Sequence, residues 1–148
     1  MTFKNALPND LKNVFYEGKQ ALKGEHRACV SCQPSHQFSG SIDLDAALKS
    51  HPKHKNANRW DYGLGLKQTG MPEEGVFWIE VHHASKSGEM LAKIRWLKNW
   101  LANEAPELKI ITKRFCWMAT SAGGTPQHHL RELQNEGLKM PRQYLVLP

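Results

Sequence analysis

The sequence of 148 residues has no apolar run that approaches the roughly 20 residues of a membrane-spanning helix. Its most apolar candidate, around Val76–Ile79, is interrupted at Glu80. The first ten residues have no apolar stretch of the kind that forms a secretory signal. Cysteine is scarce, with three residues, an odd number that favours reduced thiols over disulfides. We therefore expect an intracellular, cytoplasmic protein without a membrane segment.

Acidic residues are also in the minority, with 14 Asp and Glu against 20 Lys and Arg, which gives a net charge of +6. A basic surface favours polyanions, because neutralising phosphates releases counterions, so nucleic acid is the partner that we expect. Hydrophobic residues make up 40% and charged residues 23%, as in ordinary globular proteins, which argues against a disordered or collagen-like chain. The sequence has no internal repeat, and its length predicts one domain over residues 1–148.

The periodicity of apolar residues predicts a mixture of helices and strands along the chain. Helices are expected at Leu11–Leu22, Leu44–Leu48, Gly88–Asn103 and Gln127–Glu136. Strands are expected at Ser41–Leu44, Trp60–Leu66, Val76–His82, Leu108–Thr120 and Tyr144–Leu147, and loops at Glu25–Ser39 and His51–Asn58. Strands gathered early and a crossover helix later predict an α/β fold in which a single mixed β-sheet is flanked by helices.

Two carboxylates stand in the two most apolar strands. Asp61 lies in Trp60–Leu66 and Glu80 lies between apolar neighbours in Val76–His82. Buried charges are costly and Asp is a poor strand former, so lone acids at such positions are unusual. If the two strands pair as a hairpin, Asp61 can approach Glu80, and the alternation of side chains places His82 on the same face as Glu80. The plainer interpretation pairs Asp61 with Arg59 and leaves Glu80 facing solvent.

Two carboxylates on adjacent strands provide hard oxygen ligands that suit Mg²⁺ or Mn²⁺. An ion held there can orient and activate a water molecule against a phosphodiester. The sequence therefore offers Asp61 and Glu80 as candidate metal ligands.

With these acids in this order, the chain resembles the PD-(D/E)xK superfamily of restriction-endonuclease-like nucleases. The resemblance rests on RWDYGLG, with Asp61 at the first acid, and on WIEVHHAS, with Glu80 at the second, and it runs from the helix expected at Leu11 to the strand that ends at Thr120. It implies a restriction-endonuclease-like fold and a divalent-metal-dependent nuclease that hydrolyses DNA or RNA.

The chain departs from the family where the motif requires lysine, because His82 stands there. A neutral imidazole can act as a base near pH 7, but it supplies no permanent positive charge. Lys86, four residues further on, is the candidate for a cation that reaches the site from the following loop. Glu17, on the first expected helix, is the candidate for an additional carboxylate. The predicted catalytic set is therefore Asp61, Glu80, His82 and Lys86.

A second group has the spacing His26-x₂-Cys29-x₂-Cys32-x₃-His36. Two thiolates and two imidazoles can complete a tetrahedral zinc site, although all four ligands would come from eleven residues, a tighter spacing than in typical fingers. Three interpretations of Cys29 and Cys32 remain: zinc ligands, a redox-active pair, or two inert thiols. Inert thiols are the favoured interpretation.

Basic and aromatic residues lead into the first acid. The basic residues of this segment are His51, Lys53, His54, Lys55 and Arg59, and the aromatic residues that follow are Trp60 and Tyr62. Beside a nuclease site this segment can hold phosphates; otherwise it is a solvated loop. Two rivals to the nuclease remain: a non-catalytic nucleic-acid-binding module of the same fold, and a protein-interaction module. The small size of the chain makes a homodimer or a protein partner plausible.

Overall fold

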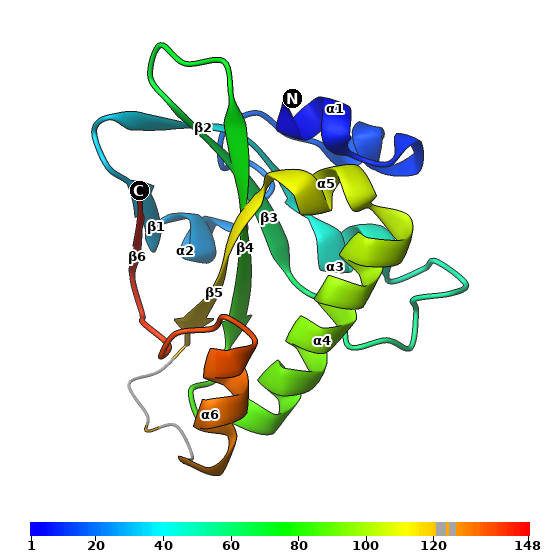
Figure 1. The fold of residues 1–148 in the computed structure, drawn as a ribbon, viewed down its shortest axis with the longest axis vertical. Helices are drawn as coiled ribbons and strands as arrows, with labels where there is room; N and C mark the ends of the chain where they lie inside the picture. The colour runs from blue at the N-terminus through cyan, green and yellow to red at the C-terminus, as the bar shows by residue number, and fades with distance from the viewer. Residues whose placement is uncertain (121–123, 125–126) are drawn as a thin grey trace.

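The computed structural model describes residues 1–120, 124 and 127–148, and a four-stranded mixed sheet lies at its centre (Figure 1). Its strands follow the order β2-β3-β4-β5 across the sheet. The first three are antiparallel and β5 is parallel to β4. The bounds are His36–Asp43 for β2, Tyr62–Gln68 for β3, Glu74–His82 for β4 and Thr112–Ala119 for β5. This arrangement confirms the predicted α/β class with a mixed sheet.

Helices and a second, smaller sheet surround the main sheet (Figure 1). The helices are α1 (Phe3–Ala6), the 3₁₀ helix η1 (Asn9–Val14), α2 (Gly24–Arg27), α3 (Leu44–Leu48), α4 (Ser87–Glu104), α5 (Pro106–Ile111) and α6 (Gln127–Asn135). The smaller sheet pairs β1 (Val30–Cys32) with β6 (Leu145–Leu147) in parallel. None of the helices in the described ranges is long and apolar enough to cross a membrane.

The hairpin of β3 and β4 is the element that the sequence predicted most clearly. Tyr62 faces Ile79 and Gly63 faces Trp78 in its register. Gly63 is required here, because a Cβ at this position would lie 2.8 Å from the Trp78 ring. Without a side chain at 63, the fully buried indole lies flat over the neighbouring strand.

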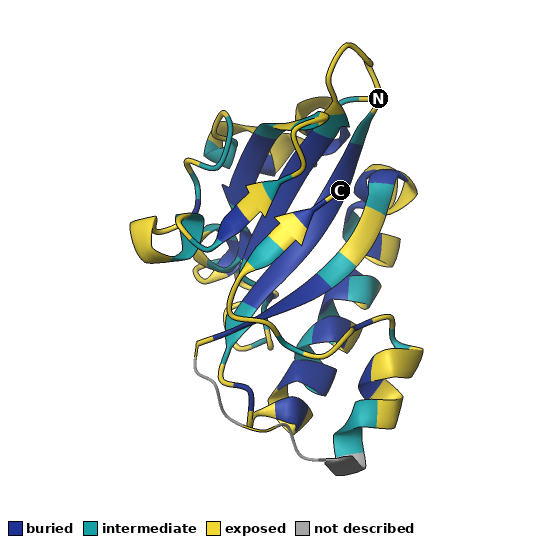
Figure 2. Ribbon diagram, turned by 90° about the vertical axis from the view of Figure 1, so that its left-hand side faces the viewer, coloured by how far each residue is buried: buried dark blue, intermediate teal, exposed yellow. Residues whose placement is uncertain are grey.

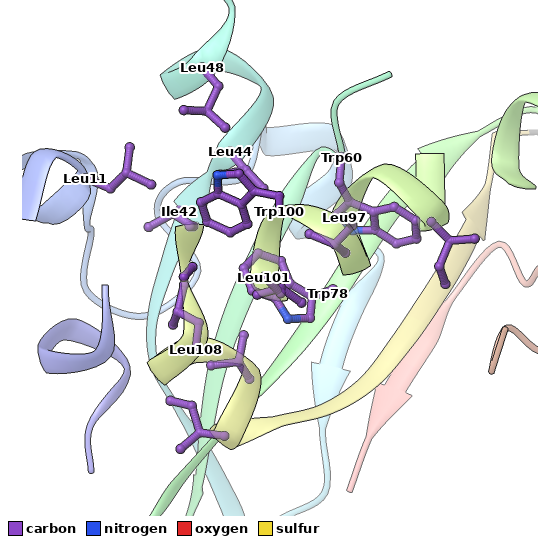
Figure 3. Packing of buried hydrophobic residues seen from close by; sticks show 14 of the residues in the cluster. Leu11, Ile42, Leu44, Leu48, Trp60, Trp78, Leu97, Trp100, Leu101 and Leu108 are labelled. Carbon is purple, nitrogen blue, oxygen red and sulfur yellow. The ribbon is translucent and has the colours of Figure 1, made fainter. Parts of the chain in front are cut away.

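Helix α4 covers one face of the sheet and closes the larger hydrophobic core (Figure 3). Trp78 of β4 meets Trp100 of α4 edge to face, with ring centroids 6.2 Å apart. Ile94 and Leu97 of α4 are completely buried beside them. The opposite face carries a second core cluster, in which β3, β4 and β5 pack against β1 and β6. Figure 2 shows the interior strands of the main sheet buried along most of their length.

Three segments differ from the sequence-based expectation. The predicted helix Leu11–Leu22 is wrong: η1 ends at Val14, Tyr16 pairs with Ser41 beside β2, and Gly18 turns the chain with a φ of +56°. The chain leaves the helical path because Phe15 packs against Gly40 of β2, where a Cβ would lie 2.1 Å from its ring. Glu17 is consequently not on a helix.

The other differences concern where strands begin. The strand expected from Leu108 starts at Thr112, because Pro106 begins the short helix α5, whose Leu108 and Ile111 are buried. The loop expected over Glu25–Ser39 contains α2, β1 and the start of β2. The remaining helices α3, α4 and α6 lie where the periodicity predicts them.

Candidate active site

Asp61 comes directly before β3, at the end of the sheet that α3 and α4 border. Its backbone carbonyl accepts a hydrogen bond from the Leu44 amide at 2.8 Å, which ties the start of β3 to the start of α3. Its carboxylate atom Oδ2 accepts the Val81 amide of β4 at 3.0 Å. Strand pairing and this second bond together hold the Asp61 carboxylate against the neighbouring strand.

Glu80 lies on β4 and its side chain is completely buried, on the same face of the strand as Trp78. Its Oε1 accepts the Asp61 amide at 3.0 Å. The two acids therefore link each other's segments. Asp61 Oδ2 accepts from the Val81 amide, next to Glu80, and Glu80 Oε1 accepts from the Asp61 amide. The predicted approach of Asp61 to Glu80 is present in the structure, and the plainer interpretation, with Glu80 facing solvent, is wrong.

Lys93 of α4 provides the positive charge at this pair, and sequence reasoning missed it. Its Nζ donates to Glu80 Oε2 at 2.7 Å and to the Arg59 carbonyl at 3.0 Å. The side chain is 19% exposed, so the ammonium lies between the buried carboxylate and the surface. Its position was the available signal, because Lys93 is three residues after buried Met90 and four before buried Leu97. A residue with this spacing borders the buried face of the helix.

The electrostatics of the pair follow from burial and like charge. Burial, and then the charge of Asp61, raise the pKa of Glu80 to about 8, although Lys93 acts in the opposite direction. Burial likewise raises the pKa of Asp61, opposed by its hydrogen bond from the Val81 amide. The pKa values of both carboxylates are thus raised, and a cation placed beside them would favour their ionised forms.

His82 lies at the rim of the same site. Its Nδ1 is 3.8 Å from Glu80 Oε2, and its Nε2 lies 2.5 Å from Glu89 Oε2 of α4. This contact with His82 is the main factor that lowers the pKa of Glu89. Glu89 therefore fixes the imidazole ring beside Glu80, on the face that strand alternation predicted.

Lys86 is exposed in the turn before α4, and within the described residues it forms no ion pair or hydrogen bond with either acid. Lys93 stands next to Glu80 instead. The prediction that Lys86 supplies the cation of the site is thus not supported by the geometry, because its backbone lies in the turn that precedes the helix and its side chain points to solvent.

The chemistry of the donor set fits Mg²⁺ or Mn²⁺. Both carboxylates are hard oxygen ligands, and Mg²⁺ is often bound by one or two carboxylates, with water and substrate phosphates completing its shell. In the part of the chain that the structure describes, no three His, Cys, Asp or Glu side chains are grouped so that they could hold a metal. Asp61 and Glu80 would accordingly hold such an ion as a pair.

The four residues with zinc-like spacing are engaged separately. His26 Nδ1 lies 2.8 Å from the Tyr62 hydroxyl, and the Cys32 thiol donates to the His36 carbonyl at 3.3 Å. The Cys29 thiol donates to the Glu25 carbonyl at 3.5 Å. Since β1 begins between the two cysteines, the ligands are directed to different partners, and these residues form no tetrahedral set.

The basic segment before β3 is largely structural. Arg59 binds Asp45 at 3.0 Å and two backbone carbonyls, and buried His54 binds Glu104 of α4. Trp60 and Tyr62 are buried in the two core clusters. These contacts anchor the segment to α3 and α4. Lys53 also pairs with Glu104, at 3.6 Å, so exposed Lys55 is the lysine of this segment that could contact a phosphate.

Comparisons of the chain with protein-family models, with curated proteins and with solved structures found no match.

Proposed function

We propose that the protein is a divalent-metal-dependent nuclease of the restriction-endonuclease-like type. One observation carries the proposal: the carboxylates of Asp61, directly before β3, and of Glu80 on β4 each accept a backbone N–H from the other's segment, with a lysine ammonium 2.7 Å from Glu80. The order of elements supports it, since three antiparallel strands are followed by a long helix and a parallel strand. The resemblance to the PD-(D/E)xK superfamily implies a first helix, a strand hairpin, a long helix and a further strand, and all but the helix expected at Leu11–Leu22 are present.

In the proposed reaction Asp61 and Glu80 hold Mg²⁺ or Mn²⁺. When bound, the ion polarises a phosphoryl oxygen and lowers the pKa of a coordinated water. Glu80 must be ionised to act as a ligand, and Lys93 favours that ionised form through its hydrogen bond to Oε2. Lys93 also supplies the permanent positive charge that His82 cannot, so it takes the role that the family assigns to the motif lysine.

His82 is the candidate to accept a proton from the attacking water. Its imidazole is partly exposed, lies beside Glu80, and is oriented by Glu89 of α4. A histidine held in this manner can act as a general base near neutral pH. Glu89 would then be a positioning residue that acts through the ring.

A cleavage assay tests the proposal. Labelled single-stranded and duplex DNA and RNA are incubated with the wild-type protein, Asp61→Asn and Glu80→Gln, in Mg²⁺, Mn²⁺ or EDTA. Asp10→Asn, at an exposed acid of η1, is the matched control. We expect metal-dependent cleavage by the wild type and the control, and at least a hundredfold loss in the two site variants. Equal cleavage by all four proteins would refute the assignment.

The second candidate is a non-catalytic nucleic-acid-binding module of the same fold. It is favoured by one observation: both oxygens of buried Glu80 already accept hydrogen bonds, from the Asp61 amide and from Lys93. In that case the three residues only join β3, β4 and α4. Binding of the same oligonucleotides in EDTA, with no cleavage in either metal, would establish this alternative and exclude the nuclease.

A further inference from the structure

A groove beside β5 is lined by residues that play no part in the proposed function. It is a cavity of about 270 Å³ between β5 and the C-terminal segment. Residues 114–117 of β5 form one wall and residues 139, 140, 142 and 144–147 form the other. Figure 2 shows β5 at the margin of the main sheet and β6 leading to the C-terminus. Neither Asp61 nor Glu80 lines this cavity.

The β5 wall presents backbone groups that no neighbouring strand pairs. At one end of this edge Arg142 donates to the Trp117 carbonyl at 3.2 Å and accepts from the Ala119 amide at 2.9 Å. Backbone groups alternate in direction along a strand, so the N–H and C=O of Phe115 point to the same outer side as those of Trp117 and Ala119. Among the described residues no backbone group outside β4 bonds to Phe115. An open edge of this kind accepts an added strand.

The charges around the open edge have a single sign. Arg114, Lys139 and Arg142 line the groove and are exposed, and no acidic residue lines it. Beside them two apolar side chains are largely exposed, Tyr144 at 70% and Val146 at 59%. A binding partner of matching chemistry therefore carries negative charge together with apolar groups.

The charge pattern selects among possible occupants. A second copy of this chain, docked edge to edge about a two-fold axis, would place the three cations against the same three cations, which is repulsive. A nucleic-acid strand matches the charge, but its phosphodiester backbone does not present alternating N–H and C=O groups at strand spacing to pair with Phe115. An extended peptide offers both N–H and C=O groups at strand spacing.

We propose that the outer edge of β5 binds an extended acidic segment of a partner protein by strand addition. The segment pairs with the backbone of Phe115, its acidic side chains meet Arg114, Lys139 and Arg142, and its apolar side chains contact Tyr144 and Val146. This interaction goes beyond the nuclease function and requires neither of the two site carboxylates.

The test uses a fluorescent eight-residue peptide of alternating glutamate and valine, measured by anisotropy in EDTA at low salt. Its control is the same peptide with lysine for glutamate. We expect the wild type to bind only the acidic peptide. Substitution of the three groove cations by glutamine (R114Q, K139Q and R142Q together) is expected to weaken binding about tenfold or more. The charge-matched control replaces three exposed lysines that do not line the groove, Lys4, Lys12 and Lys49, by glutamine. It should bind as the wild type does.

Hydrogen exchange tests the backbone pairing directly. Saturating acidic peptide is expected to slow exchange of the Phe115 amide by tenfold or more, while the amide of Ile79 inside the sheet is unaffected. Absence of acidic-peptide binding, equal weakening in both triple variants, or no protection at Phe115 would each overturn the proposal. Binding of a thymidine oligonucleotide that the groove variant alone loses, without peptide binding, would assign the groove to nucleic acid instead.

Discussion

Replacing Glu80 by glutamine tests whether the buried carboxylate of the site holds a proton in the way its surroundings require. The folded-state pKa of Glu80 is about 8, raised by burial and by Asp61, against 4.5 for the group in an unfolded chain. Between these values the folded protein keeps a proton that the unfolded chain has released. The contribution of Glu80 to stability is therefore greatest below pH 4.5 and falls as the pH rises to about 8.

The size of the effect follows from the separation of the two pKa values. They differ by about 3.5 pH units, and each unit corresponds to about 1.4 kcal/mol, so the free energy of unfolding falls by up to about 5 kcal/mol across this window. Glu80→Gln cannot ionise, so its stability should lack this component of the pH dependence.

The assay is urea denaturation of both proteins in EDTA at pH 5, 7 and 9. We expect the stability difference to shift in favour of Glu80→Gln by several kcal/mol between pH 5 and pH 9. Glu107→Gln, at an exposed acid of α5, is the control and should follow the wild type throughout. A difference between the wild type and Glu80→Gln that stays constant with pH would refute the reasoning.

Three other changes probe the cation, the packing and the thiols. Lys93→Met leaves Glu80 buried without its cation, so urea denaturation should show a free energy of unfolding lower by about 3–5 kcal/mol at pH 9. The loss should be smaller at pH 6, where Glu80 is protonated, and equal losses at the two pH values would argue against the ion pair. Gly63→Ala should cost about 1–3 kcal/mol because its Cβ would meet Trp78 at 2.8 Å, whereas Gly24→Ala, with no atom within 4 Å, should be nearly neutral by the same measurement. Burial raises the pKa of Cys116 to about 11, so a thiol reagent at pH 8 should modify Cys29 well before Cys116. Equal modification rates for the two thiols in the folded protein would contradict the burial of Cys116.

The hairpin and its acids were predictable because their signals are local. Alternation in β3 and β4 fixes which side chains share a face, and a short connection pairs the strands. The lone acids Asp61 and Glu80 stood out against apolar neighbours, so their approach could be inferred before any coordinates. The burial of Glu80 was not predicted, because coverage of both faces of β4 depends on elements distant in the sequence.

Features that depend on contacts distant in sequence could not be predicted. The spacing of Lys93 places it at the border of the buried face of α4, but its partner Glu80 is set by the crossing of α4 over β4, which the sequence does not specify. The pairing of β1 with β6 joins segments more than 100 residues apart, and neither strand has a pattern that specifies the other. At Leu11–Leu22 the apolar spacing was helical, but packing of Phe15 against Gly40 overrode that local preference.

Binding of Mn²⁺, followed by the loss of its free-ion electron paramagnetic resonance signal, tests most directly whether Asp61 and Glu80 form a metal site. We predict that the wild-type protein binds one ion per chain and that the double substitution Asp61→Asn and Glu80→Gln abolishes this binding, while Asp10→Asn retains it. Undiminished Mn²⁺ binding by the double variant, or no binding by the wild type, would contradict the account.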